Sequence, residues 1–176
     1  YPFTITEAEE MIITENHSNY SSYGVSCNGA TDGFIDITVT GGTGNYTYAW
    51  DNGETSQDLS NIGAGTYAVT ATDENGCSAS IEIELTEPDE LIITKSVSEF
   101  ACGYNVSGYN LNDGFIDITV TGGAGNYTYA WSNGETSQDL ENISAGAYTV
   151  TASDENGCSI FISAELNEAS EFNVEI

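Results

Sequence analysis

The side chains that could do chemistry are nearly all carboxylates. The 176 residues include 28 Asp and Glu, a single cation, Lys95, and a single imidazole, His17. Loop carboxylates are the ligands that a hard cation such as calcium prefers. The candidate ligands recur at matching positions along the chain and are Asp32, Asp36, Asp58, Asp73, Asp113, Asp117, Asp139 and Asp154. Residues 73–76, Asp-Glu-Asn-Gly, have the wrong glycine spacing for an EF-hand and suit an ordinary hairpin, so calcium and a structural turn both stay open.

Catalysis by these residues is not expected. Acid–base work by two carboxylates needs a pair held in contrasting environments, and no such pair stands out. His17 and Lys95 are matched elsewhere in the chain by Val97 and Glu15, so neither recurs. The glycines at 41, 42 and 44 lead from one expected strand into another, whereas a nucleotide-binding loop leads into a helix. We therefore predict that the protein is not an enzyme.

The net charge of −27 excludes two further classes of partner. Nucleic acid binding requires clustered Lys and Arg, and docking on anionic lipid requires a polybasic segment. No apolar run approaches the roughly 18 residues that a spanning helix needs. We expect neither nucleic acid binding nor membrane insertion.

The four cysteines predict disulfides rather than zinc. The chain has no Cys-x-x-Cys pair and only one histidine. Cys77 and Cys158 are equivalent, 81 residues apart, whereas Cys27 is matched by Gly108 and Cys102 lies six residues before that glycine. We predict the pairs Cys27–Cys77 and Cys102–Cys158, one within each half, in an oxidising extracellular compartment.

An internal repeat positions all of these residues. Residues 32–78 and 113–159 differ at seven of 47 aligned positions. Such a period predicts repeated structural units. We expect one domain over 1–85 and a second over 86–165, with a short linker at 86–90. Residues 166–176 copy the opening segment again, and we expect them to form the first strand of a third repeat or a strand shared with a neighbouring subunit.

Each repeat is predicted to be all-β. Ile35, Ile37 and Val39 alternate with polar residues, as in a half-buried strand, and Asn52-Gly53 favours a tight hairpin. No window has helical periodicity. The sequence from Ala64 to Tyr67, Ala-Gly-Thr-Tyr, matches a tyrosine corner, in which a tyrosine hydroxyl bonds to nearby backbone. The expected fold is therefore a tandem pair of immunoglobulin-like antiparallel β-sandwiches, with Trp50 in the core.

Three aromatic residues, Phe34, Phe115 and Phe161, are expected on the outer faces of strands. Exposed aromatics stack on sugar rings or contact neighbouring subunits. A surface polysaccharide is therefore one candidate partner. Covering a strand edge is the simpler role for these side chains.

Several motifs together resemble the SprB repeat. They are Cys-Asn-Gly-Ala-Thr-Asp-Gly from Cys27, Gly-Asn-Tyr-Thr-Tyr-Ala-Trp from Gly44, Ala-Gly-Thr-Tyr from Ala64 and Asp-Glu-Asn-Gly-Cys from Asp73. That repeat occurs in tandem in large secreted surface proteins of Bacteroidota, among them gliding-motility adhesins. The resemblance implies type IX secretion, display at the cell surface and a structural or adhesive role, and it brings no catalytic residues.

The leading hypothesis is a structural and adhesive repeat segment of an extracellular surface fibre, with neighbouring repeats or like subunits as partners. One alternative is a filament subunit that polymerises by strand addition through residues 166–176. The other is a carbohydrate-binding module that uses the outer aromatics.

Overall fold

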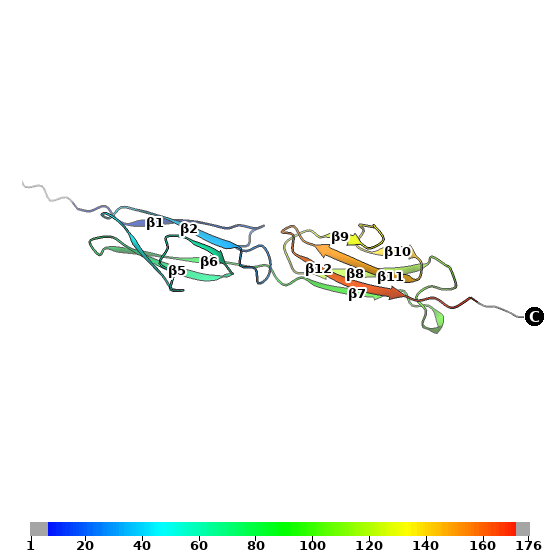
Figure 1. Ribbon diagram of the computed structural model, residues 1–176. Helices are drawn as coiled ribbons and strands as arrows, with labels where there is room; N and C mark the ends of the chain where they lie inside the picture. The colour runs from blue at the N-terminus through cyan, green and yellow to red at the C-terminus, as the bar shows by residue number, and fades with distance from the viewer. Residues whose placement is uncertain (1–6, 172–176) are drawn as a thin grey trace, which may run out of the picture. The chain divides into compact units, whose positions relative to one another are not determined.

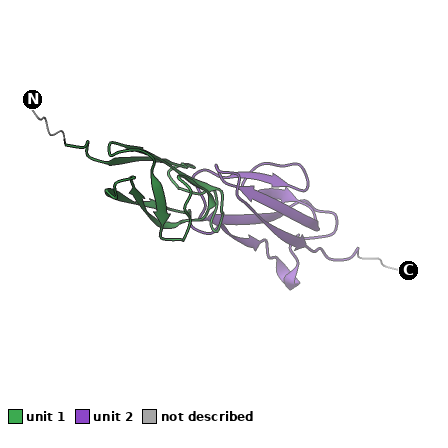
Figure 2. Ribbon diagram, turned by 60° about the vertical axis from the view of Figure 1, so that its left-hand side comes forward, with its two compact units in different colours: residues 1–88 green, residues 89–176 purple. Residues whose placement is uncertain are grey.

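The computed structural model describes residues 7–171 and divides the chain into two compact units. Unit 1 comprises residues 1–88 and unit 2 comprises residues 89–176 (Figure 2). The division falls at Pro88, within the segment 86–90 that the sequence indicated as a linker.

Unit 1 consists of two three-stranded antiparallel sheets (Figure 1). The first has the order β1-β2-β4 and the second the order β3-β5-β6. The strands are β1 Ile12–His17, β2 Gly33–Thr40, β3 Thr47–Trp50, β4 Leu59–Ile62, β5 Gly65–Thr72 and β6 Ser78–Leu85.

Unit 2 repeats this arrangement with sheets β7-β8-β10 and β9-β11-β12. Its strands are β7 Ile92–Val97, β8 Gly114–Thr121, β9 Thr128–Trp131, β10 Leu140–Ile143, β11 Gly146–Ser153 and β12 Ser159–Leu166. One short 3-10 helix, η1 Ala101–Gly103, lies in the loop between β7 and β8. Within residues 7–171, no helix has the length and apolarity needed to cross a membrane. The expected all-β, immunoglobulin-like fold is confirmed.

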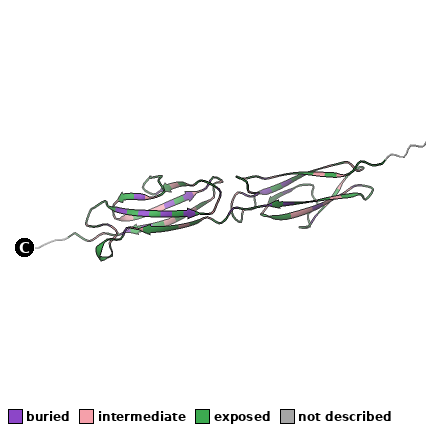
Figure 3. Cartoon of the chain, turned by 180° about the vertical axis from the view of Figure 1, so that it is seen from behind, coloured by how far each residue is buried: buried purple, intermediate pink, exposed green. Residues whose placement is uncertain are grey.

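The core of each unit lies between its two sheets. In β2 the side chains of Ile35 and Ile37 are fully buried, while Phe34 before them and Asp36 between them are exposed. Figure 3 shows buried and exposed positions alternating along the strands. This is the alternation that the sequence predicted, since successive residues of a strand point to opposite faces. Trp50 lies in the same core and donates its indole N–H to the carbonyl of Ser56 at 2.9 Å.

The predicted tyrosine corner is present in both units. The hydroxyl of Tyr67 donates to the carbonyl of Gly63 at 3.0 Å, and the hydroxyl of Tyr148 donates to that of Ser144 at 3.0 Å. The bond fixes the turn that leads into the central strand of the second sheet, β5 in unit 1 and β11 in unit 2.

Each unit has two ends, which we name by the course of the chain. At the entry end the first strand, β1 or β7, begins. At the exit end the last strand, β6 or β12, finishes. Leu166 is the final residue of β12, so it belongs to unit 2. Of the segment 166–176, expected to open a third repeat, residues 172–176 lie outside the described part of the chain.

Candidate functional site

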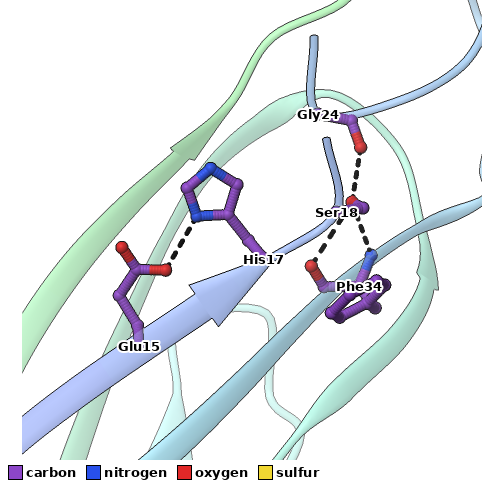
Figure 4. A network of polar contacts seen from close by, with 5 residues as sticks. All are labelled: Glu15, His17, Ser18, Gly24 and Phe34. Carbon is purple, nitrogen blue, oxygen red and sulfur yellow. Dashed lines mark hydrogen bonds and ion pairs between the residues drawn. The ribbon is translucent and has the colours of Figure 1, made fainter. Parts of the chain in front are cut away.

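The exit end of unit 1 is built around a buried serine that the sequence did not indicate. Ser18 directly follows β1, and its hydroxyl donates to the carbonyl of Gly24 at 2.5 Å (Figure 4). The same oxygen accepts the backbone N–H of Phe34 at 3.0 Å. Ser98 does the same in unit 2, bonding to Asn105 and Phe115. These serines tie the loop before the second strand to the sheet.

The adjacent histidine forms a different contact. Nδ1 of His17 lies 2.7 Å from Oε2 of Glu15, two residues earlier on β1 (Figure 4). Because the hydroxyl of Ser18 is bound to backbone groups, these three side chains are not arranged as a nucleophile, base and orienting acid.

The exit loop of unit 1 binds the segment that leads out of the unit. Backbone N–H groups of Gly24 and Val25 donate to the carbonyl of Thr86 at 2.8 and 3.2 Å. The side chain of Asn28 donates to the carbonyl of Pro88. The residue after Asn28, a glycine, donates its N–H to the carboxylate of Glu87 at 2.6 Å. The outgoing segment is therefore part of the fold of unit 1 through Pro88.

Unit 2 binds its own outgoing segment in the same manner. N–H groups of Asn105 and Val106 donate to the carbonyl of Asn167 at 2.9 and 3.2 Å, and the N–H of Asn110 donates to the carboxylate of Glu168 at 2.7 Å. In each unit the exit loop thus binds the Thr-Glu or Asn-Glu dipeptide that follows the last strand of that unit.

Two of the calcium candidates stabilise these exit loops. The carboxylate of Asp32 accepts the N–H of Ser26 at 3.1 Å, and that of Asp113 accepts the N–H of Ser107 at 3.0 Å. The serine hydroxyl is the main cause of a pKa below the usual value for Asp32 and for Asp113, and the serine backbone N–H is the second cause. Both donors favour the ionised carboxylate.

Two further candidates anchor the entry ends. The carboxylate of Asp73 accepts the N–H groups of Thr43, Asn75 and Cys77 at 2.8 to 2.9 Å, and also the Thr43 hydroxyl. Burial raises the pKa of Asp73, but these hydrogen bonds outweigh it and leave the pKa below its ordinary value. Asp154 holds the equivalent turn of unit 2 through Ala124, Asn156 and Cys158. In both turns the carboxylate oxygens already serve as acceptors.

The last four candidates lie along the first sheet of each unit. Asp58 accepts the N–H of Ile37 at 2.9 Å, and the side chain of Gln57 donates to the carbonyl of Ile37 at 2.6 Å. β4 pairs with β2 only over residues 33–35, so these two side chains replace the missing strand at Ile37. Asp36 is exposed on the same strand, β2.

Unit 2 has the same replacement of a strand by side chains. Asp139 and Gln138 bind the backbone of Ile118 at 2.8 and 2.7 Å. A groove of about 280 Å³ beside them is lined by Asp117, Asp139 and Phe115, among others. The charge of Asp139 raises the pKa of Asp117.

The eight candidate carboxylates therefore occupy three separate places in each unit: the exit loop, the first sheet and the entry turn. Among residues 7–171, no group of three or more His, Cys, Asp or Glu side chains is arranged to hold a metal ion.

The outer aromatics are exposed, as expected, but they do not form one platform. Phe34 is 39% exposed on β2, Phe115 is 42% exposed on β8 and Phe161 is 70% exposed on β12. β8 and β12 belong to different sheets of unit 2, so Phe115 and Phe161 lie on opposite faces of that sandwich.

The predicted disulfide pairs are wrong in this structure. Cys77 and Cys102 are free thiols, and Cys27 and Cys158 are disulfide-bonded. Cys77 precedes β6 at the entry end, whereas Cys27 lies in the exit loop beside the residues that follow β6. A strand of this length separates its ends by about 27 Å, and a disulfide requires Cα atoms within about 7 Å. Cys158 and Cys102 are separated in the same way by β12.

The fold and the exit loops define two immunoglobulin-like units, each of which binds the segment that follows its last strand. The family model of the SprB repeat matches residues 22–55 and 105–136, which cover the exit loop, the second strand and the third strand of each unit. One of the two matches lies in each unit.

Comparison with curated proteins finds no match. Among solved structures, the chain is similar to the C-terminal 282-residue fragment of intimin, crystallised in complex with the intimin-binding domain of the translocated intimin receptor. The identity is 14%, the TM-score is 0.44, and the similarity covers 92% of this chain. The chain spans 64% of the length of that fragment.

Proposed function

We propose that the chain is a structural and adhesive segment of a large cell-surface protein or fibre in which SprB repeats follow one another. The observation that carries the proposal is the exit loop. It binds the outgoing Thr86-Glu87 in unit 1 and Asn167-Glu168 in unit 2 with matching hydrogen bonds. A unit that folds around the segment opening its successor is suited to a tandem array, since each repeat then contacts mainly its neighbours.

Surface chemistry supports an extracellular setting. The chain has 28 acidic side chains against one lysine, and like charge keeps such repeats soluble and apart from one another. A disulfide at Cys27 and Cys158 suits an oxidising compartment. The side chains with catalytic potential, His17 and Ser18, form local contacts with Glu15 and with backbone groups. These features support a binding and scaffolding role.

Location is tested with antibodies against the chain on intact source cells. We expect labelling without permeabilisation and loss of the signal after brief external protease treatment. A signal that requires cell lysis would contradict the proposal.

Adhesion is tested with beads coated with the chain, counted after flow over protein-coated and polysaccharide-coated surfaces. We expect retention above that of beads coated with serum albumin. The matched variant carries Phe34→Ser, Phe115→Ser and Phe161→Ser, which change exposed side chains only. Loss of retention in this variant on polysaccharide alone would favour the carbohydrate-binding alternative, and equal loss on both surfaces would favour general adhesion through the aromatics.

Calcium binding stays a prediction. A ligand that binds only the native state raises stability by mass action. We expect a calcium-binding chain to melt at a higher temperature in millimolar calcium than in chelator, and an unchanged melting temperature would contradict calcium binding.

A further inference from the structure

The last strand of unit 1 is an open sheet edge. β6 pairs with β5 along its whole length, from Gly65↔Leu85 to Thr72↔Ser78, without a bulge (Figure 1). Within residues 7–171, no strand pairs with its other side. Native proteins commonly protect such an edge with a lysine, a proline or a bulge, and β6 has none of these.

The pairing with β5 shows which backbone groups of β6 face the open side. The carbonyl of Ala68 on β5 accepts the N–H of Asp51 at 3.0 Å, so it points toward β3. Its partner on β6, Glu82, therefore lies in a pair without mutual hydrogen bonds and directs its own N–H and C=O to the open edge. Because this direction recurs at every second residue, Ser78 and Ser80 do the same. The first half of β6 thus offers a row of donors and acceptors to another strand.

Unit 2 closes the same edge with a cation. The equivalent of Glu82 is Ser163, and its carbonyl accepts a hydrogen bond from the ammonium group of Lys95 on β7. Unit 1 has Glu15 at the position of Lys95, and its carboxylate contacts His17 instead. The edge is therefore covered by an ammonium group in unit 2, whereas in unit 1 it is left open and carries two carboxylates.

A groove lies beside the first residues of β6. It has a volume of about 730 Å³ and is lined by residues 7–11, 42 and 77–79. The N–H of Gly42 holds the carbonyl of Glu9 at 2.9 Å, which fixes the segment that precedes β1. One wall carries the exposed carboxylates of Glu7, Glu9 and Glu10. We name this groove and the adjoining open edge, residues 7–11, 42 and 77–82, the β6 edge groove.

Charge decides which occupant fits the β6 edge groove. Like charges placed opposite each other on paired strands are destabilising, so a second β6 is a poor partner. The 176 residues contain a single cation, so neither another part of them nor a second copy can supply a basic strand. In an added strand the side chains alternate between the two faces of the sheet. Basic residues would lie on the outer face beside Glu82, and apolar residues would lie beside Met11 and Ala79 in the groove.

We propose that the β6 edge groove binds an extended segment of a different protein, with alternating basic and apolar residues, by adding it as an antiparallel strand to β6. In strand addition the main-chain hydrogen bonds supply affinity and the alternate side chains supply specificity. The inference rests on the proposed adhesive role and names the chemistry of the partner.

The test uses a capped peptide of alternating Lys and Val, as long as β6, and two N-methylated isomers of it. Methylation at every Lys removes the N–H groups that would face β6, and methylation at every Val removes those that face away. Fluorescence anisotropy at physiological ionic strength measures the affinity, and amide NMR shifts locate the bound peptide. We expect the isomer methylated at Val to bind like the parent peptide, and the isomer methylated at Lys to bind at least about tenfold more weakly. The largest shifts should fall on residues 78–82.

Matched variants of the chain test the same contact. Ser78→Pro removes an N–H that faces the open edge and leaves the ladder with β5 intact, and it should weaken binding about fivefold. Ser159→Pro is its equivalent in unit 2 and should leave binding unchanged. Glu15→Lys copies Lys95 into unit 1 without a proline, and it should also weaken binding because it covers the edge and removes a negative charge.

Equal binding of the two methylated isomers would overturn the proposal, because charge alone would then explain the attraction. So would the absence of binding, shifts centred outside residues 78–82, or full affinity in Glu15→Lys. A chain that retains surface labelling and bead adhesion but does not bind the peptide would refute this inference and leave the proposed function standing. Peptide binding by a chain that is absent from the cell surface would contradict the proposed function instead.

Discussion

Unit 1 and unit 2 share their cores almost residue for residue but differ along the side where the first strand approaches the last. In unit 2 Lys95 on β7 donates a hydrogen bond to the carbonyl of Ser163 on β12. The corresponding residues of unit 1 are Glu15 and Glu82, and Glu15 binds His17 on its own strand instead. β1 and β6, like β7 and β12, belong to different sheets, so no backbone ladder joins them. Exposed side chains along this edge are therefore free to change between the two units.

The hairpin after the first strand differs in a second way. In unit 1 the tight turn uses Ser21 and Ser22, both at positive φ. In unit 2 Cys102 and Gly103 take those conformations, and one residue has been added before them. The turn conformation is thus kept while its side chains change. That change places a thiol at the exit end of unit 2.

Substitution of the two core tryptophans should have the largest effect on the stability of the units. Trp50→Ala should destabilise unit 1 by about 3–5 kcal/mol, and Trp131→Ala should do the same to unit 2, because each opens a cavity in a separate core. Calorimetry should show one of two unfolding transitions move while the other stays. Equal movement of both transitions in either variant would contradict independent units.

The two tyrosine corners should contribute equally to the stability of their units. Tyr67→Phe and Tyr148→Phe each remove one hydroxyl that donates to a carbonyl, and each should cost about 1 kcal/mol. Urea unfolding, followed for each unit by the fluorescence of its own tryptophan, measures both. A loss of stability in only one of the two variants would show that the hydroxyl of the other tyrosine does not stabilise its unit.

Acid should weaken both exit loops by the same mechanism. The folded-state pKa of Asp32 and Asp113 lies below the ordinary value of 3.8. The stability that each carboxylate adds is therefore complete above that pH and is lost as pH falls through it. Asp32→Asn and Asp113→Asn should lower the urea midpoint at pH 7, and the difference from the unsubstituted chain should narrow below pH 4. A difference that persists at pH 2 would contradict this assignment.

The carboxylates of the first sheet should give the opposite dependence of stability on pH. Asp139 raises the pKa of Asp117, so the stability associated with protonated Asp117 is present at low pH and is lost as pH rises through the raised value. Asp117→Asn removes this repulsion. The variant should have a slightly higher urea midpoint than the unsubstituted chain at pH 7 and no advantage at pH 2. A decrease at pH 7 would contradict the repulsion.

The smallest effect should come from Lys95. Lys95→Met keeps the aliphatic stem but removes the bond to Ser163, and it should cost unit 2 at most about 1 kcal/mol because the ammonium group is exposed. Glu15→Met in unit 1 is the matched control and should change stability less. Chemical unfolding in low salt detects the difference, and equal effects of the two variants would show that the bridge between β7 and β12 contributes nothing specific.

The strands, the buried faces and the tyrosine corner were predictable because each is encoded by residues close together in the sequence. The alternation around Ile35 fixes which face is buried, and the Ala-Gly-Thr-Tyr motif at 64–67 fixes the corner. The disulfide pattern was not predictable in this way, because the predicted pair Cys27–Cys77 assumed one bond within each repeat, whereas β6 holds these two residues at opposite ends of unit 1.

Several site contacts that the sequence did not indicate join side chains to distant backbone. Ser18 bonds to Phe34, and Gln57 and Asp58 bond to Ile37, some 20 residues away. Ser, Gln and Asp are common in exposed loops, so their types alone carry no signal for such a contact. The repeat preserved these residues in both units, but it preserved almost every other residue as well.

The chain enters and leaves each unit at opposite ends, and this has a mechanical consequence. The chain enters unit 2 where β7 begins and leaves it at the opposite end, where β12 finishes. Tension on the chain therefore pulls β7 lengthwise against β8, and the ladder from Ile92↔Thr121 to Val97↔Ile116 is loaded in shear. Its hydrogen bonds must break together rather than one after another, so each unit resists stretching much more than peeling.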